Sequence, residues 1–144
     1  RRVGRSGRTD SRGTVRAASE LADLLPAADV VILAVPLTDA TRRMADDAFL
    51  SRMRDGAVLV NVARGAVADT KALLRHADRL ALVLDVTDPE PLPEDHPLWE
   101  KAALITPHAG GASAAFAPRI KALVRRQAER LIAGDQPENV VLQP

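Results

Sequence analysis

The sequence predicts an α/β fold in which helices flank a parallel, doubly wound sheet. Apolar runs of strand length alternate with segments of helical spacing, as in consecutive right-handed βαβ crossovers. The runs are apolar at consecutive positions, which is typical of strands buried on both faces. Polar residues follow directly after several runs, at the sheet edge where open α/β sheets bind ligands.

The first half of the chain contains the first such run. Residues 17–25 have helical spacing and are stopped by Pro26. Residues 30–35 (VVILAV) predict a strand, and the continuous apolar run favours a central position over an edge. A short helix is predicted over 46–54, with acids at its start and Arg at its end, matching the helix dipole.

The same alternation continues in the second half. A helix is predicted over 69–77, and a longer one over 112–133 with Gly134 as its C-cap. A proline-rich loop covers 87–98. The remaining apolar runs predict three strands, at 57–62, 80–86 and 103–106.

Composition limits the class of protein. The 144 residues fit one ordinary domain, and 47% hydrophobic with 27% charged residues is a globular composition. No apolar run approaches the ~20 residues that span a bilayer, so we expect no membrane partner. A net charge of +1 argues against nucleic acid as a partner. The absence of cysteine excludes disulfides and thiolate sites, and favours a cytoplasmic location.

Four motifs at the predicted strand ends resemble a known family. In order they are ADVVILAVPLTDAT (28–41), GAVLVNVARGAVADT (56–70), LDVTDPEPLPEDHPLW (84–99) and LITPHAGG (104–111). Together they resemble the NAD(P)-binding domain of D-isomer-specific 2-hydroxyacid dehydrogenases. The resemblance implies a Rossmann-type sheet whose ligand lies outside the carboxyl ends of the strands.

The chain departs from the family at its start. A complete member would also have a substrate domain, and a G-x-G-x-x-G phosphate loop that none of the early glycines provides. We therefore expect a Rossmann domain that is incomplete at the N-terminus, with Val3 ending its second strand. Residues 1–111 would be the C-terminal part of the NAD(P)-binding domain, and 112–144 a final helix and tail returning towards a substrate domain.

The resemblance assigns three catalytic residues, which should face one cleft. His108 would be the acid/base that protonates a carbonyl oxygen, although a lone His could instead cap the final helix. Glu90 would pair with this His, or be a solvated loop acid. Arg64 would grip the substrate carboxylate, as a planar guanidinium can, or form an ordinary surface ion pair. Arg64 and His108 would also border the cofactor.

The resemblance also assigns cofactor contacts. Asp85 would receive the nicotinamide carboxamide, with a turn or helix-cap Asp as the alternative. Pro36 and Thr41 would line the adenosine side. Ala63 and Gly110 would contact the nicotinamide through their backbone, which only small residues permit.

The remaining aromatic and histidine residues are not assigned to the site. Trp99 is equally well explained as a packing anchor and as a pocket wall. His76 and His96 are assigned no role. No spacing of His, Asp and Glu suggests a metal site, and hydride transfer needs none.

The basic start of the chain predicts the cofactor. If Val3 ends the second strand, Arg5 and Ser6 follow it and no acid occurs before Asp10. An acid at this place accepts the ribose of NAD, whereas Arg accommodates the 2′-phosphate of NADP. We therefore expect NAD(P), with NADP(H) favoured, as in the glyoxylate and hydroxypyruvate reductases of the family. The alternative is a solvated terminus.

The function implied is an NAD(P)-dependent oxidoreductase that acts on the CH–OH group of D-2-hydroxy acids or reduces 2-keto acids. The alternative is a truncated, catalytically inactive dinucleotide-binding or dimerisation module, and we expect these 144 residues alone to turn over negligibly. The family implies a homodimer through 42–54 and 112–133. Four apolar residues of the first segment could form that surface or belong to the core: Met44, Phe49, Leu50 and Met53.

Overall fold

The structure is a computed structural model that describes residues 1–139. The chain forms two compact units, residues 1–108 and the residues from Ala109 onward.

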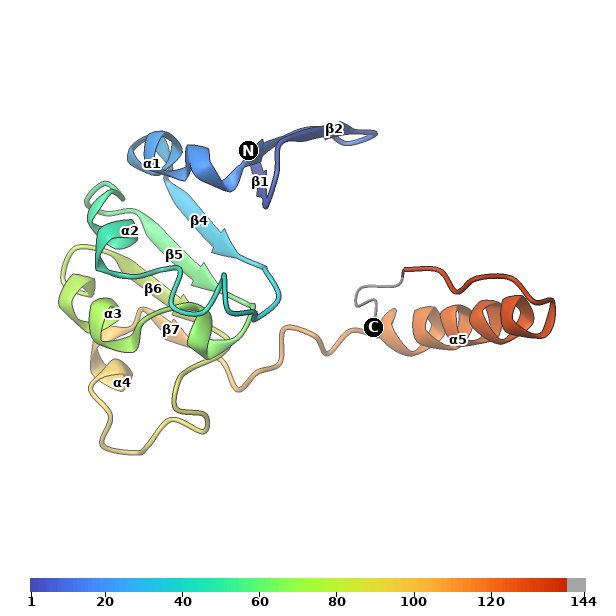
Figure 1. The fold of residues 1–144 in the computed structure, drawn as a ribbon. Helices are drawn as coiled ribbons and strands as arrows, with labels where there is room; N and C mark the ends of the chain where they lie inside the picture. The colour runs from blue at the N-terminus through green and yellow to red at the C-terminus, as the bar shows by residue number, and fades with distance from the viewer. Residues whose placement is uncertain (140–144) are drawn as a thin grey trace. The chain divides into compact units, whose positions relative to one another are not determined.

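Four parallel strands form the main sheet of the first unit, as predicted, and Figure 1 shows them side by side and pointing the same way. The sheet order follows the chain order, β4-β5-β6-β7. The strands are β4 (Val30–Leu33), β5 (Val58–Asn61), β6 (Ala81–Leu84) and β7 (Leu104–Ile105).

The carboxyl ends of these strands are in register. Leu33 pairs with Asn61, Asn61 with Leu84, and Leu84 with Ile105, and each is the last residue of its strand. The next residues of all four strands therefore emerge at one edge of the sheet. This confirms the predicted fold class and the shared rim.

Short helices connect the strands. Asp46 caps α2 (Asp47–Ser51) by accepting from the Phe49 amide, and Asp69 caps α3 (Thr70–His76) by accepting from the amides of its first turn. A 3-10 turn, η3 (Gly65–Val67), and a short helix, α4 (Leu98–Lys101), complete the connections. The α4 helix was not predicted, because it lies at the end of a proline-rich loop.

The core lies between the sheet and α2 and α3. Its largest fully buried apolar side chains are Leu50, Leu59, Leu82, Leu84, Leu98 and Val67. Phe49 and Met53 are also buried, and Met44 packs against this cluster. Of the two alternatives that the sequence left open for these four residues, a dimer surface or the core, the structure supports the core.

The β4 strand differs from its prediction. Within the described residues it pairs with β5 alone, and Val30 and Ile32 are 52% and 61% exposed. The apolar run correctly indicated a strand. It could not distinguish a central strand from an edge strand, because hydrophobicity does not report how many neighbours a strand has.

A second, small sheet precedes the main one. It contains β1 (Arg2–Gly4), β2 (Arg8–Asp10) and β3 (Gly13–Ala17) in the order β1-β3-β2. Val3 lies in β1, one residue before its end, close to the expected position. The hairpin β2–β3 was not predicted, because most of its residues are exposed and few are apolar.

Helical turns link the small sheet to β4. The helix expected over 17–25 is divided into η1 (Ala18–Glu20), α1 (Leu21–Leu24) and η2 (Leu25–Ala27). Pro26 lies inside η2 and lacks the amide hydrogen that an α-helix would use. The segment therefore ends as a 3-10 turn.

Arg79 connects three segments of the first unit. Its guanidinium donates to the carbonyls of Leu50 and Met53, at the end of α2, and to Asp55. Its Nε donates to His76 Nδ1 at 2.9 Å, on α3. His76 therefore has a structural partner.

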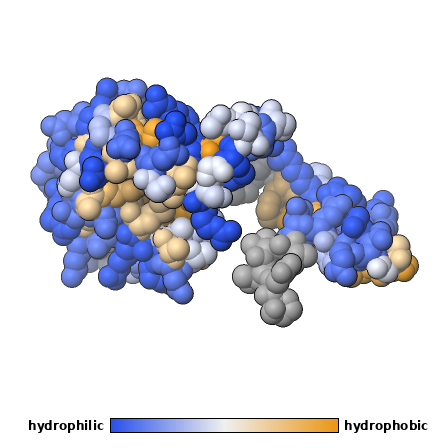
Figure 2. Space-filling view, turned by 45° about the horizontal axis from the view of Figure 1, so that its top comes forward, coloured by the Kyte–Doolittle hydropathy of each residue, from blue (hydrophilic) through white to orange (hydrophobic). Residues whose placement is uncertain are grey.

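Among residues 109–139 the second unit contains one helix, α5 (Phe116–Ile132), within the predicted range. Gly134 follows it with φ 79°, and its amide donates to the Leu131 carbonyl, so it is the predicted C-cap. None of the helix side chains is buried, and Figure 2 shows this unit mostly hydrophilic with apolar atoms at one end. No described helix is long and apolar enough to cross a membrane.

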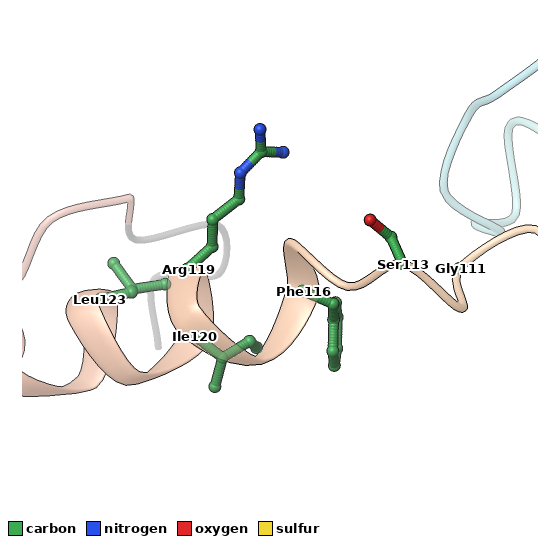
Figure 3. A pocket seen from close by; sticks show the side chains of 6 residues that line it. All are labelled: Gly111, Ser113, Phe116, Arg119, Ile120 and Leu123. Atoms are coloured by element: carbon green, nitrogen blue, oxygen red, sulfur yellow. The ribbon is translucent and has the colours of Figure 1, made fainter.

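A shallow hollow lies at the start of α5. Its lining side chains include Ser113, Phe116 and Arg119, and Figure 3 shows Arg119 pointing away from the Phe116 ring. All of its residues belong to the second unit. It contains none of the predicted site residues.

Candidate active site

The turn after β5 places Arg64 at the rim. Asn61, the last residue of the strand, is 1% exposed, and its side chain bonds the turn twice. Its Nδ2 donates to the Arg64 carbonyl and its Oδ1 accepts from the Ala63 amide, each at 3.1 Å. Ala63 is buried, whereas Arg64 is exposed and its Nη1 donates to the Ala63 carbonyl at 2.6 Å.

Gly65 brings the Arg64 turn against the loop after β6. A Cβ at this position would lie 1.8 Å from the Thr87 carbonyl oxygen and 2.7 Å from the Asp88 nitrogen. Real Cβ atoms do not approach backbone this closely, so only glycine fits. The two rim loops are therefore in direct backbone contact.

Two threonines hold the loop that carries Glu90. The Thr70 hydroxyl donates to the Asp88 carbonyl at 2.6 Å, and the Thr87 hydroxyl donates to the Pro89 carbonyl at 2.9 Å. Thr70 opens α3, so the loop is attached to a helix of the core as well as to itself. Glu90 follows immediately.

Glu90 and His108 form a pair. Glu90 Oε1 lies 2.7 Å from His108 Nδ1, and about two-fifths of each side chain is exposed. The His108 amide donates to the Asp85 carbonyl, and its φ of 54° turns the chain sharply after β7. A carboxylate can only accept a hydrogen bond, so Nδ1 is the donor and Nε2 is left to exchange a proton with a ligand. The alternative that His108 merely caps the final helix does not describe this arrangement.

Asp85 lies at the end of β6 and is 8% exposed. The Thr106 hydroxyl donates to Asp85 Oδ1 at 2.5 Å. The Asp85 amide donates to the Asn61 carbonyl, which continues the sheet pairing by one residue. Asp85 is therefore fixed between the ends of β5 and β7.

The loop after β4 is closed by Thr41. Its hydroxyl donates to the Pro36 carbonyl at 2.6 Å and accepts from the Thr38 amide at 2.8 Å. The structure thus brings Pro36 and Thr41 together. Because the Thr41 hydroxyl is already bonded within the loop, its role is to fix the shape of the loop that would line the adenosine side.

The basic segment follows β1. Arg5 and Ser6 are exposed, and the Arg8 guanidinium lies beside Gly4, 2.9 Å from where a Cβ would be. Arg2 is paired with Asp10, and this pairing lowers the Asp10 carboxyl pKa, with the Arg12 amide as the next cause. Within residues 1–139 no acidic side chain forms an ion pair with Arg5 or Arg8.

Trp99, His96 and Gly110 lie outside the Arg64 turn and the Glu90–His108 pair. Trp99 is half exposed and donates its indole N–H to the Pro93 carbonyl at 2.7 Å, so it anchors the proline-rich loop. His96 Nδ1 accepts from the Leu98 amide at the start of α4. Gly110 belongs to the second unit.

Sequence reasoning missed the roles of Asn61 and Thr106. A polar residue ending an otherwise apolar strand was the available signal for Asn61. Thr106 had no comparable signal, because its partner Asp85 lies on another strand. Among the described residues no group of three or more His, Cys, Asp or Glu could hold a metal ion.

Comparison with known proteins identifies the family. The sequence model of the D-isomer specific 2-hydroxyacid dehydrogenase, NAD binding domain, matches residues 2–110. The chain belongs to this family. The predicted family and the NAD(P)-binding assignment are thereby confirmed.

Several members of the dehydrogenase family are similar to the chain. Glyoxylate reductase of Aeropyrum pernix is 41% identical over 128 residues, covering 84% of this chain and 37% of that protein. Erythronate-4-phosphate dehydrogenase of Salinibacter ruber is 46% identical over 114 residues, covering 74% and 29%. The chain therefore spans about a third of the length of the curated relatives it matches.

A solved dehydrogenase structure extends the likeness to the fold. The D-isomer specific 2-hydroxyacid dehydrogenase from Xanthobacter autotrophicus Py2, in complex with NADPH and MES, superposes with a TM-score of 0.85. The two are 29% identical, and the match covers 97% of this chain and 59% of that chain.

The residues present fit a nicotinamide dinucleotide of this dehydrogenase family. Arg5 and Arg8 provide cationic groups with no ion-paired acid among the described residues, which suits a phosphate. The buried Asp85 carboxylate at the strand ends suits an amide donor. Ala63, which is small and buried at the rim, permits close approach of a ring.

Proposed function

We propose that the chain is the nucleotide-binding part of an oxidoreductase that interconverts 2-keto acids and D-2-hydroxy acids with NADP(H). The observation that carries this proposal is the Glu90–His108 pair, 2.7 Å apart, in which Glu90 belongs to the loop that contacts the Arg64 turn through Gly65. An acid/base and a carboxylate anchor are thereby held at the same rim.

Each side chain has a distinct task in the proposed reduction. Arg64 binds the substrate carboxylate through two parallel N–H donors and so orients the neighbouring carbonyl. His108 gives the Nε2 proton to the carbonyl oxygen as the carbonyl carbon is reduced. Glu90 keeps the Nδ1 proton in place and stabilises the imidazolium before the proton leaves. The bound nicotinamide supplies the hydride.

The preference for NADP(H) rests on charge at the end of β1. Arg5 and Arg8 would pair with a 2′-phosphate and Ser6 would donate a hydrogen bond, whereas no acid is present there to bind a ribose hydroxyl. The similar Xanthobacter autotrophicus structure contains NADPH, which supports the preference. The name glyoxylate reductase, carried by the Aeropyrum pernix relative, supports a small 2-keto acid as substrate.

We also propose a cytoplasmic homodimer with no nucleic acid or membrane partner. The exposed apolar side chains of α5 replace residues 44–53 as the surface for self-association. Phe116, Ile120 and Val124 are spaced along one stripe of this helix and are 59%, 44% and 61% exposed. Light scattering tests this part of the proposal, and a strictly monomeric profile of the folded chain would contradict it.

The decisive experiment compares binding with turnover. The chain and the product of its complete reading frame are titrated with NADPH and NADH, then assayed with glyoxylate, hydroxypyruvate and pyruvate. We expect both polypeptides to bind NADPH more tightly than NADH, and Arg5→Asp to reverse this order. We expect turnover only from a polypeptide that also carries a substrate domain. Equal use of NADH by the unmutated protein would refute the cofactor preference.

The same experiment addresses the alternative function. NADPH binding by both polypeptides, without turnover of any 2-keto acid, would support a dinucleotide-binding or dimerisation module. Turnover that is lost in His108→Gln would support the enzyme. Robust turnover by the 144 residues alone would show that they need no further domain.

A further inference from the structure

The Arg64 turn contains two residues that touch no proposed ligand but fix the shape of the rim. Asn61 is a fully buried amide that bonds the backbone on both sides of the turn, at the Ala63 amide and the Arg64 carbonyl. Gly65 leaves no room for a Cβ against the Thr87 carbonyl. Buried polar groups of this kind are costly unless each is satisfied, so the geometry they impose is well defined.

These contacts continue to the acid/base pair. Thr87, which Gly65 contacts, donates its hydroxyl to the Pro89 carbonyl, and Glu90 follows Pro89. Glu90 in turn holds His108. A continuous set of contacts and covalent links therefore leads from the Asn61 amide to the His108 imidazole.

We propose that Asn61 and Gly65 are positioning residues that hold the substrate anchor Arg64 and the Glu90–His108 pair at one fixed separation. This inference rests on the proposed function for the identity of the ligand, a 2-keto acid. The coupling of the Arg64 turn to the Glu90 loop does not depend on the proposed function. Asn61 sets the shape of the turn, and Gly65 sets how closely the turn approaches the Glu90 loop.

The two positions differ in what a substitution removes. Asn61→Asp has the same shape and keeps the acceptor for the Ala63 amide, but it replaces the donor to the Arg64 carbonyl with an oxygen. Asn61→Ala removes both bonds. Gly65→Ala leaves both bonds and instead forces the Thr87 segment away.

The test measures two affinities for each variant. Oxamate, a 2-keto acid analogue, is titrated in the presence of NADPH, and NADPH is titrated alone, using the product of the complete reading frame. Asn61→Asp and Gly65→Ala should weaken oxamate binding about 10- to 100-fold, as expected for a misplaced anchor, and change NADPH affinity by less than about threefold. The control is Leu59→Ala, a buried position on the same strand. It should lower stability and leave the ratio of the two affinities unchanged.

A second measurement decides the coupling even if oxamate does not bind. The amides of Val67 and Ala68 donate to the carbonyls of Arg64 and Gly65, so their hydrogen exchange reports the turn. Asn61→Ala should accelerate both, and Gly65→Ala should shift the His108 ring resonances.

The outcomes separate the two claims. Failure of the unmutated protein to bind oxamate would refute the proposed substrate, while the exchange and ring signals would still decide the inference. Unchanged exchange in Asn61→Ala together with unchanged His108 resonances in Gly65→Ala would overturn the inference. If Gly65→Ala does not fold, the isosteric variant Asn61→Asp decides the inference. An unchanged ratio of oxamate to NADPH affinity in Asn61→Asp would overturn it.

Discussion

Removal of the Thr106 hydroxyl should cost stability and cofactor affinity together. The hydroxyl donates to Asp85 Oδ1 at 2.5 Å, and Asp85 is only 8% exposed, so water cannot easily replace the donor. A hydrogen bond to a charged group contributes roughly 1.5–3 kcal/mol. Thr106→Val keeps the shape and removes the donor. The free energy of unfolding should therefore fall by about 1.5–3 kcal/mol, and Tm by about 3–12 °C.

The assay combines urea unfolding with NADPH titration. Thr106→Val removes one of the contacts that hold the Asp85 side chain, so NADPH affinity should fall several-fold. The control is Thr9→Val on the exposed strand β2, which should change neither quantity. A Thr106→Val protein with unchanged stability would refute the reasoning about the buried carboxylate. A loss of stability with unchanged NADPH affinity would refute the role of Asp85 in cofactor binding.

Three further predictions concern the first unit. Glu90→Gln should release the His108 ring from a single tautomer, measured by imidazole nitrogen shifts, and a retained Nδ1–H signal would contradict this. The hydrogen bond from Arg75, and then that from His76, lowers the Asp47 carboxyl pKa, so its stabilisation is present above about pH 4 and is lost as pH falls further. Asp47→Asn should flatten acid unfolding in this range, and an unchanged pH profile would contradict this. Leu50→Ala should lower the free energy of unfolding by about 2–5 kcal/mol in urea, since Leu50 is fully buried, and a smaller loss would indicate that the core repacks.

The main sheet could be predicted from the sequence because each of its strands contains an apolar run of strand length. The shared rim followed from the parallel topology alone. The pairing of Glu90 with His108 came from the family motifs, since spacing in the chain cannot bring residues 18 positions apart together. The fold then placed them 2.7 Å apart.

Other features depended on tertiary contacts that a sequence does not display. The edge position of β4 depends on its neighbours, and the burial of Phe49 and Met53 depends on where α2 packs. The β2–β3 hairpin has few apolar residues, so periodicity gave no signal. Gly65 occurs in a recognisable motif, but its necessity became apparent only from the position of Thr87.

The Arg79 fork has a consequence for how the chain can vary in length. Its nitrogens donate to Leu50, Met53 and Asp55, so one planar guanidinium holds the end of α2 and the first residues of the connection towards β5. An inserted residue between 51 and 55 would shift these acceptors out of reach and leave a partly buried cation without them. Insertions and deletions should therefore be excluded here, whereas the exposed turn at 10–13 can accept them. Loop grafting or tag insertion in this protein should use the turn at 10–13 and avoid residues 51–55.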